Sequence, residues 1–165
     1  MDILSKLNTL LVESFKSSNT LEEKSENMSV PIESNTSYLS YSFDKNVPST
    51  GLFPFFNKTK LVHAMCDYII FCFHSNRLYV LLVELKHGGN NVTKQLKAGK
   101  CFAEFVVSTL NRIENLNIIP EIRCISIRNK NIINKRTTKI REAKYDENDL
   151  CNFSGNRFRV DEFLK

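Results

Sequence analysis

Apolar residues recur along the chain in two ways, with the period of a strand in some segments and of a helix in others. Between residues 66 and 87 (CDYIIFCFHSNRLYVLLVELKH) two apolar runs flank a short polar segment. Each run is too short for a long helix and is rich in Tyr, Ile, Val and Phe, which is typical of β-strands. The polar segment (HSNR) indicates a tight turn, because asparagine tolerates left-handed backbone dihedrals. The pattern therefore predicts a β-hairpin.

The register of this hairpin brings two acidic residues together. If Ser75 and Asn76 are the two loop residues, Asp67 lies directly opposite Glu84. Opposed Cβ atoms on one face of a sheet are about 4.5–5.5 Å apart, a distance at which two carboxylates repel. Alternation places Lys86 on the same face as Glu84. The sequence therefore predicts two acids and a lysine at one end of a sheet.

Five other segments have a clear period. Helical spacing predicts helices over residues 2–16 and 92–112, and alternation predicts strands over residues 37–43, 121–127 and 156–164. The order is then helix, three strands, helix, strand, followed by a closing edge strand. We expect a mixed α/β fold in which helices pack on a mixed sheet.

The remaining segments lack such a period. Residues 17–36 are polar and rich in Ser, Asn and Glu, which predicts a loop, with Thr20 as the cap of a short helix through Glu23 as the alternative. Residues 51–56 (GLFPFF) contain a proline that disfavours a central strand, so we expect their aromatic rings to cover an edge of the core. Residues 87–91 (HGGNN) predict a flexible connection whose last asparagine caps the following helix.

Composition fits one globular domain spanning residues 1–165, since 42% of the 165 residues are hydrophobic and 25% are charged. The five cysteines form no C-x-x-C pair and have no histidine at zinc spacing, which indicates free thiols in a reducing compartment. No apolar run has the length of a membrane span, and the N-terminus lacks the pattern of a signal peptide. We therefore expect a cytoplasmic protein with no membrane partner.

The net charge of +5 favours an acidic partner. Seven basic residues fall between positions 128 and 144, and isoleucines interrupt them, which is unlike a disordered basic tail. This segment is either a basic hairpin that lines a groove or a solvated surface, and the net charge favours the groove. The start of the helix predicted at 92–112 adds Lys94 and Lys97, which suit contact with phosphate groups.

Two readings of the acidic pair remain open at this stage. Mg²⁺ binds oxygen ligands, often one or two carboxylates together with water and substrate phosphate, and would stabilise Asp67 beside Glu84. Alternatively, Lys86 simply neutralises the two acids in a salt bridge at the end of the strand. The acid placed opposite by the hairpin favours the metal site.

Asp67, the hairpin and the Glu84-x-Lys86 motif at the end of an apolar strand resemble the core of the PD-(D/E)XK nuclease superfamily. The resemblance covers about residues 60–110, and Cys66 stands where the superfamily usually has proline. It implies a restriction-endonuclease-like core over about residues 60–128, with extra C-terminal strands. It also implies hydrolysis of phosphodiester bonds, with DNA as the usual substrate.

The resemblance implies roles for individual residues. Asp67, Glu84 and the backbone carbonyl of Leu85 would bind Mg²⁺, for which Mn²⁺ would substitute. Lys86 would orient or deprotonate the attacking water and offset charge on the phosphate. Gln95 would orient the site, as in exonuclease-like branches, although Gly99 replaces the tyrosine of those branches, and a surface glutamine is the alternative.

Further residues follow from the same resemblance. Glu13 is a candidate for the additional acid that superfamily members often carry on the preceding helix, and a solvated glutamate is the alternative. The residues expected to bind nucleic acid are basic and are Lys94, Lys97, Arg128, Lys130, Lys135, Arg136 and Lys139.

The function predicted is a metal-dependent nuclease acting on DNA, as a subunit of a larger system, a homodimer or with a partner protein. The alternative is a module of the same fold that binds nucleic acid or a protein without catalysis.

Overall fold

The computed structural model describes residues 2–43, 45, 47–49, 51–57, 59, 61–86, 92–128, 143–147 and 149–165. Within these ranges the helical elements are α1 (Ile3–Leu10), α2 (Thr93–Glu114) and the two 3-10 helices η1 (Glu13–Phe15) and η2 (Val160–Phe163). The strands are β1 (Thr20–Glu23), β2 (Met28–Glu33), β3 (Tyr38–Tyr41), β4 (Tyr68–His74), β5 (Arg77–Lys86), β6 (Glu121–Arg128), β7 (Leu150–Phe153) and β8 (Phe158–Arg159). The prediction of a mixed α/β fold is confirmed.

Two mixed sheets are present in the described part of the chain. The larger has the order β3-β4-β5-β6-β7, in which β3, β4 and β5 are antiparallel and β5, β6 and β7 are parallel. The smaller has the order β1-β2-β8, with β1 antiparallel and β8 parallel to β2. The predicted order of helix, three strands, helix and strand is not the observed one, because β1 and β2 lie between α1 and β3, so that five strands precede α2.

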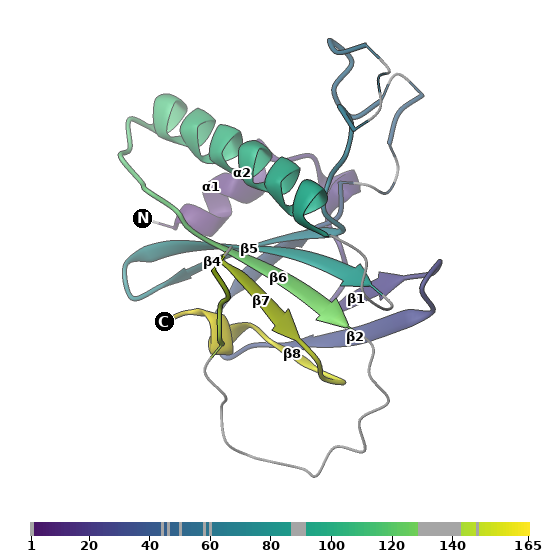
Figure 1. Cartoon of the computed structure of the whole chain (residues 1–165). Coiled ribbons are helices and arrows are strands. Elements are labelled where there is room, and N and C mark those ends of the chain that lie inside the picture. The colour runs from purple at the N-terminus through teal and green to yellow at the C-terminus, as the bar shows by residue number, and fades with distance from the viewer. Residues whose placement is uncertain are drawn as a thin grey trace.

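The five-stranded sheet is the middle layer of the molecule. Helices α1 and α2 lie on one face, and β1, β2, β8 and η2 lie on the other (Figure 1). The alternation of β5 serves both faces: Val80 and Leu82 belong to the core under the helices, and Leu81 and Val83 to the core between the sheets. A central strand with a core on each side explains why the β5 sequence is a nearly continuous apolar run.

The β4–β5 hairpin has the predicted register. His74 pairs with Arg77, and the pairing continues to Tyr68 opposite Val83. Ser75 and Asn76 have φ of 48° and 62°, which is the left-handed geometry that a two-residue hairpin turn requires. The turn therefore fixes which residues meet at the other end of the hairpin.

The predicted loop at residues 17–36 is wrong, because this segment forms β1, a turn and β2. In β2 the side chains of Met28, Val30 and Ile32 are buried and alternate with more exposed positions, so half of the strand faces the second core. Thr20 begins a strand and does not cap a helix. Burial of these few apolar residues outweighs the polar composition of the segment.

Two predicted elements are shorter than expected. The helix at residues 2–16 ends at Leu10, and residues 13–15 form η1. The closing strand at 156–164 is reduced to the two residues of β8, which pair with β2 at the edge of the smaller sheet, and η2 follows. The helix predicted at 92–112 is confirmed as α2, which ends at Asn115 in a left-handed conformation.

Residues 51–56 divide their aromatic rings between core and solvent. Phe53 packs on Phe102 of α2 with ring centroids 5.9 Å apart, so it covers the edge of the core as expected. Phe55 and Phe56 are instead 77% and 52% exposed.

No helix within the described ranges is long and apolar enough to span a membrane.

Candidate active site

The predicted acidic pair lies at the end of the β4–β5 hairpin opposite its turn. Asp67 directly precedes β4, and Glu84 and Lys86 are among the last three residues of β5. Their face of the sheet continues from Val80 and Leu82, which are covered by α2. The structure thus places a polar cluster at the point where the apolar row beneath α2 ends.

Each of the two carboxyl groups accepts a hydrogen bond from a backbone N–H of the facing segment. The Asp67 N–H donates to Oε2 of Glu84 at 3.2 Å, and the Leu85 N–H donates to Oδ2 of Asp67 at 2.6 Å. Nζ of Lys86 lies 3.4 Å from Oε1 of Glu84. Asp67 and Glu84 are only 8% and 2% exposed. The predicted convergence of Asp67, Glu84 and Lys86 is therefore found.

The electrostatics of the pair favour a positive charge between the two acids. Burial, and then the negative charge of Asp67, raise the pKa of Glu84 to about 8. Burial lowers the pKa of Lys86, but the charges of Glu84 and Asp67 outweigh this, so that pKa is raised overall. Lys86 thus stays charged, while Glu84 holds a proton at neutral pH unless a cation replaces it.

The donor set fits a hard divalent cation. Two carboxyl groups at a partly enclosed sheet end are the protein contribution that Mg²⁺ commonly uses, with water and substrate oxygens as further ligands. The described residues hold no group of three or more His, Cys, Asp and Glu side chains placed to bind a metal ion. A cation at Asp67 and Glu84 would therefore depend on non-side-chain oxygens for the rest of its ligands.

Cys66, directly before Asp67, is set deep under α2. A Cβ atom at Gly99 of α2 would lie 2.5 Å from Sγ of Cys66, so only glycine permits this approach of the helix. Burial, followed by the charges of Glu84 and Asp67, raises the pKa of Cys66 well above its usual value. The thiol therefore stays protonated and serves in packing, which argues against a nucleophilic role.

The other predicted residues are spread over the neighbouring elements. Lys94 and Lys97 are exposed in the first turns of α2, and Gln95 between them is half-buried and makes no described hydrogen bond to the acidic pair. Arg128 ends β6, beside Lys86. Glu13 is in η1, where it forms an ion pair with Lys16 and its side chain is 73% exposed, as expected for a solvated glutamate.

Four predicted nucleic-acid contacts lie outside the described residues. They are Lys130, Lys135, Arg136 and Lys139. Asn91, the predicted cap of α2, is also outside them, and the residue that precedes the helix is Val92.

Ser126 is a polar residue of this region that sequence reasoning did not single out. It pairs in register with Glu84 and is fully buried, and its Oγ has no hydrogen-bond partner within the described structure. An unpartnered buried hydroxyl costs about 1–3 kcal/mol. The signal in the sequence is the alternation of Ser126 with the core residues Ile125 and Ile127, but its neighbour on β5 depends on the parallel register.

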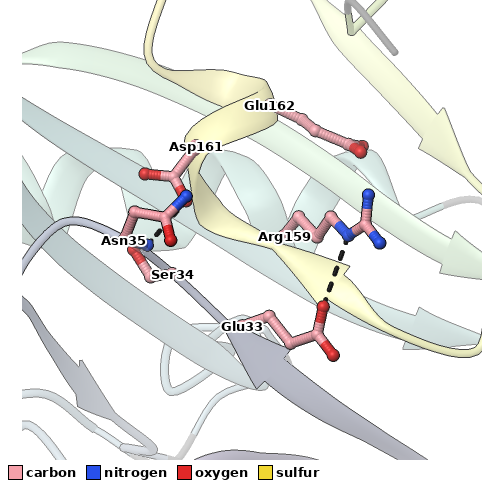
Figure 2. Close-up of a pocket in the computed structure, with 6 residues that line it drawn as sticks. All are labelled: Glu33, Ser34, Asn35, Arg159, Asp161 and Glu162. Atoms are coloured by element: carbon pink, nitrogen blue, oxygen red, sulfur yellow. Dashed lines mark hydrogen bonds and ion pairs between the residues drawn. The ribbon is translucent and has the colours of Figure 1, made fainter. Parts of the chain in front are cut away.

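A separate pocket of about 220 Å³ lies at the smaller sheet (Figure 2). Glu33 accepts from both Arg157 and Arg159, and Asp161 accepts from the Asn35 N–H and the Thr36 hydroxyl. These contacts tie the C-terminal segment to the end of β2. The pocket is lined by none of the predicted site residues.

Comparisons with known proteins return no match to a family model, a curated protein or a solved structure.

Proposed function

We propose that this protein is a Mg²⁺-dependent nuclease with a restriction-endonuclease-like core of the PD-(D/E)XK type. The observation that carries the proposal is the buried pair of Asp67 and Glu84, with Lys86 in contact with Glu84. Two acids held together in this way need a counter-charge, and a flexible lysine beside them suits proton transfer or charge stabilisation.

The residues of the chain divide the work of hydrolysis. Asp67, Glu84 and the Leu85 carbonyl would hold the ion, which when bound lowers the pKa of a coordinated water and offsets phosphate charge. The ammonium of Lys86, with its side chain 23% exposed, would orient the attacking water and stabilise negative charge on the phosphoryl oxygens. Gln95 would help to orient these groups from the start of α2.

The basic residues would hold the nucleic acid through its phosphates. Lys94 and Lys97 are exposed on α2, and Arg128 lies at the end of β6. Phosphate contacts position a strand and carry no direct sequence information, so the domain alone would select sequence weakly. DNA is the proposed substrate, with a second copy or a partner protein supplying further selectivity.

Thermal melting and cleavage with four proteins test the proposal. Mg²⁺ should raise the melting temperature of the wild type by binding the folded state, and should have little effect on Asp67→Asn or Glu84→Gln. The Lys86→Ala variant should keep most of this stabilisation but lose plasmid nicking by orders of magnitude. Nicking that persists in chelator would contradict the proposal.

A second candidate is a module of this fold that binds nucleic acid or protein without catalysis. It is favoured by one observation: the carboxyl groups already accept backbone N–H donors from Asp67 and Leu85, as a structural clasp would. In that case Asp67→Asn should lower the melting temperature, and Mg²⁺ should leave the wild type unchanged. The same four melts therefore separate the two functions.

A further inference from the structure

Strand β6 presents two unpartnered polar groups beside the acidic pair. The Ser126 hydroxyl is fully buried, Nε of Arg128 is shielded from solvent, and neither has a hydrogen-bond partner within the described structure. Buried polar groups in folded proteins are nearly always hydrogen-bonded. Two exceptions on neighbouring same-face positions of one strand therefore point to ligands bound at this end of the sheet.

The parallel register places these groups next to the candidate site. Glu84 pairs with Ser126 and Lys86 pairs with Arg128, and paired side chains of neighbouring strands lie on the same face. The preceding pair on this face, Leu82 and Cys124, belongs to the core under α2. The face thus changes from apolar to polar on both strands at the same level.

The row continues beyond β6. Ser126 pairs with Asn152 of β7, which is exposed. The polar row therefore runs from Glu84 on β5, beside Asp67, through buried Ser126 on β6 to exposed Asn152 on β7.

We propose that β6 forms the second half of this site, in which Ser126 holds a cation-bound water and Arg128 binds a phosphate oxygen of the substrate. The inference rests on the proposed function, because it takes a divalent cation on Asp67 and Glu84 as its starting point. Ser126 lies one strand spacing from Glu84 and is too buried to meet a polymer directly, which suits a small ligand such as water. The guanidinium of Arg128 is a partly exposed donor fork beside Lys86, which suits a phosphate.

The test of Ser126 measures Mg²⁺ binding through thermal melting. The Ser126→Ala variant should need about tenfold more Mg²⁺ for half of the stabilisation, which is the effect of losing an outer-shell partner. Without Mg²⁺ it should melt at or above the wild-type temperature, because the lost hydroxyl had no partner. Ser126→Cys keeps the size of the side chain with a poor donor and should give the same rise in the Mg²⁺ midpoint.

Ser40→Ala is the matched control. Ser40, on β3, is also a buried serine, but its hydroxyl lies 2.6 Å from Oγ of Ser17 and is hydrogen-bonded to it. This variant should melt at a lower temperature and keep the wild-type Mg²⁺ midpoint. If Ser126→Ala behaves in this way, Ser126 binds a structural water and its proposed role at the cation is overturned. The proposed function is judged separately: it is still supported if Mg²⁺ stabilises the wild type but not Asp67→Asn.

Arg128 is tested by binding of a labelled DNA duplex in chelator. Arg128→Gln should weaken binding and lower the slope of log affinity against log salt by about 0.9, the value for one lost phosphate contact, without changing the Mg²⁺ midpoint. Arg157→Gln removes the same charge at the distant pair with Glu33 and should leave the slope unchanged. Equal slopes for the two variants would overturn the role of Arg128.

Discussion

Burial, and then the negative charge of Asp67, raise the pKa of the Glu84 carboxyl group, and this shift makes the stability of the protein depend on pH. This pKa is about 8 in the folded protein against an ordinary value of 4.5. Between these two values the folded state holds a proton that the unfolded state has lost. The free energy of unfolding should therefore fall as pH rises through this window, by at most about 1.4 kcal/mol per pH unit.

Denaturant unfolding from pH 5 to pH 8.5 checks this expectation. Glu84→Gln cannot titrate, so its advantage in the free energy of unfolding over the wild type should grow with pH and level off above about pH 8. The difference between the two proteins removes the contribution of every group that they share. If the free energy of unfolding of the wild type and of the variant changes with pH in parallel, Glu84 does not hold the extra proton of the folded state.

Sequence reasoning found Asp67, Glu84 and Lys86 but not Ser126, for a physical reason. The acidic pair follows from local rules: strand alternation and a two-residue turn fix an antiparallel register across 18 residues or fewer. Ser126 meets Glu84 only through a parallel pairing that follows the α2 crossover. A crossover of that length leaves the register free, so packing beneath α2 sets it.

The contact between α2 and the start of β4 depends on one missing side chain. A Cβ at Gly99 would lie 2.5 Å from Sγ of Cys66, but 3.5 Å from its Cβ and 3.6 Å from Cδ2 of Leu82. The sulfur is thus the only one of these three contacts that is too close. Gly99→Ala should lower the free energy of unfolding by about 1–2 kcal/mol, because overpacking exceeds the gain in helix propensity.

A double-mutant cycle tests this contact. In a Cys66→Ala background the space opens, so Gly99→Ala should become neutral or stabilising by up to about 1 kcal/mol. Ala98→Gly, on a half-buried position of the same turn, should cost about the same in both backgrounds. A Gly99→Ala effect of equal size with and without the Cys66 sulfur would contradict the packing argument.

Among the elements, β1, β2 and β7 were not predicted, and β1 and β2 have a weak local signal. β1 (TLEE) and β2 (MSVPIE) together contain three glutamates and few apolar residues, although Met28, Val30 and Ile32 alternate. The β2 strand also contains Pro31, which sequence rules read as a break. Its place in the fold comes from the second core and from β8, which joins it from the far end of the chain.

At the scale of the whole molecule, the sequence predicted one sheet with helices on it, and the structure adds a second sheet on the other face. That sheet is closed by Ile32 and Glu33 pairing with Phe158 and Arg159, a contact between the two ends of the chain. No local sequence pattern predicts a pairing between segments so far apart in the chain. The second layer leaves the α2 side of the main sheet as the face that carries the polar row of the candidate site (Figure 1).

A basic segment separates β6 from β7 in the sequence. It follows Arg128 directly, and its charges include Lys135, Arg136 and Lys139, which lie outside the described residues. If these cations contact phosphates, their binding releases counterions, and affinity falls steeply with salt. Changing all three to glutamine should lower the slope of log affinity against log salt by up to about 2.7, at about 0.9 for each lost contact.

The control for this prediction removes three charges elsewhere. Arg77 begins β5 at the hairpin turn, Arg112 is in the last turn of α2, and Arg157 pairs with Glu33 near the smaller sheet, all away from the acidic pair. Their change to glutamine lowers the net charge equally. A nonspecific effect of net charge would lower the slope of log affinity against log salt equally in both triple variants. A groove formed by the basic segment requires a lower slope in the first variant alone, because only its three cations would then contact phosphates.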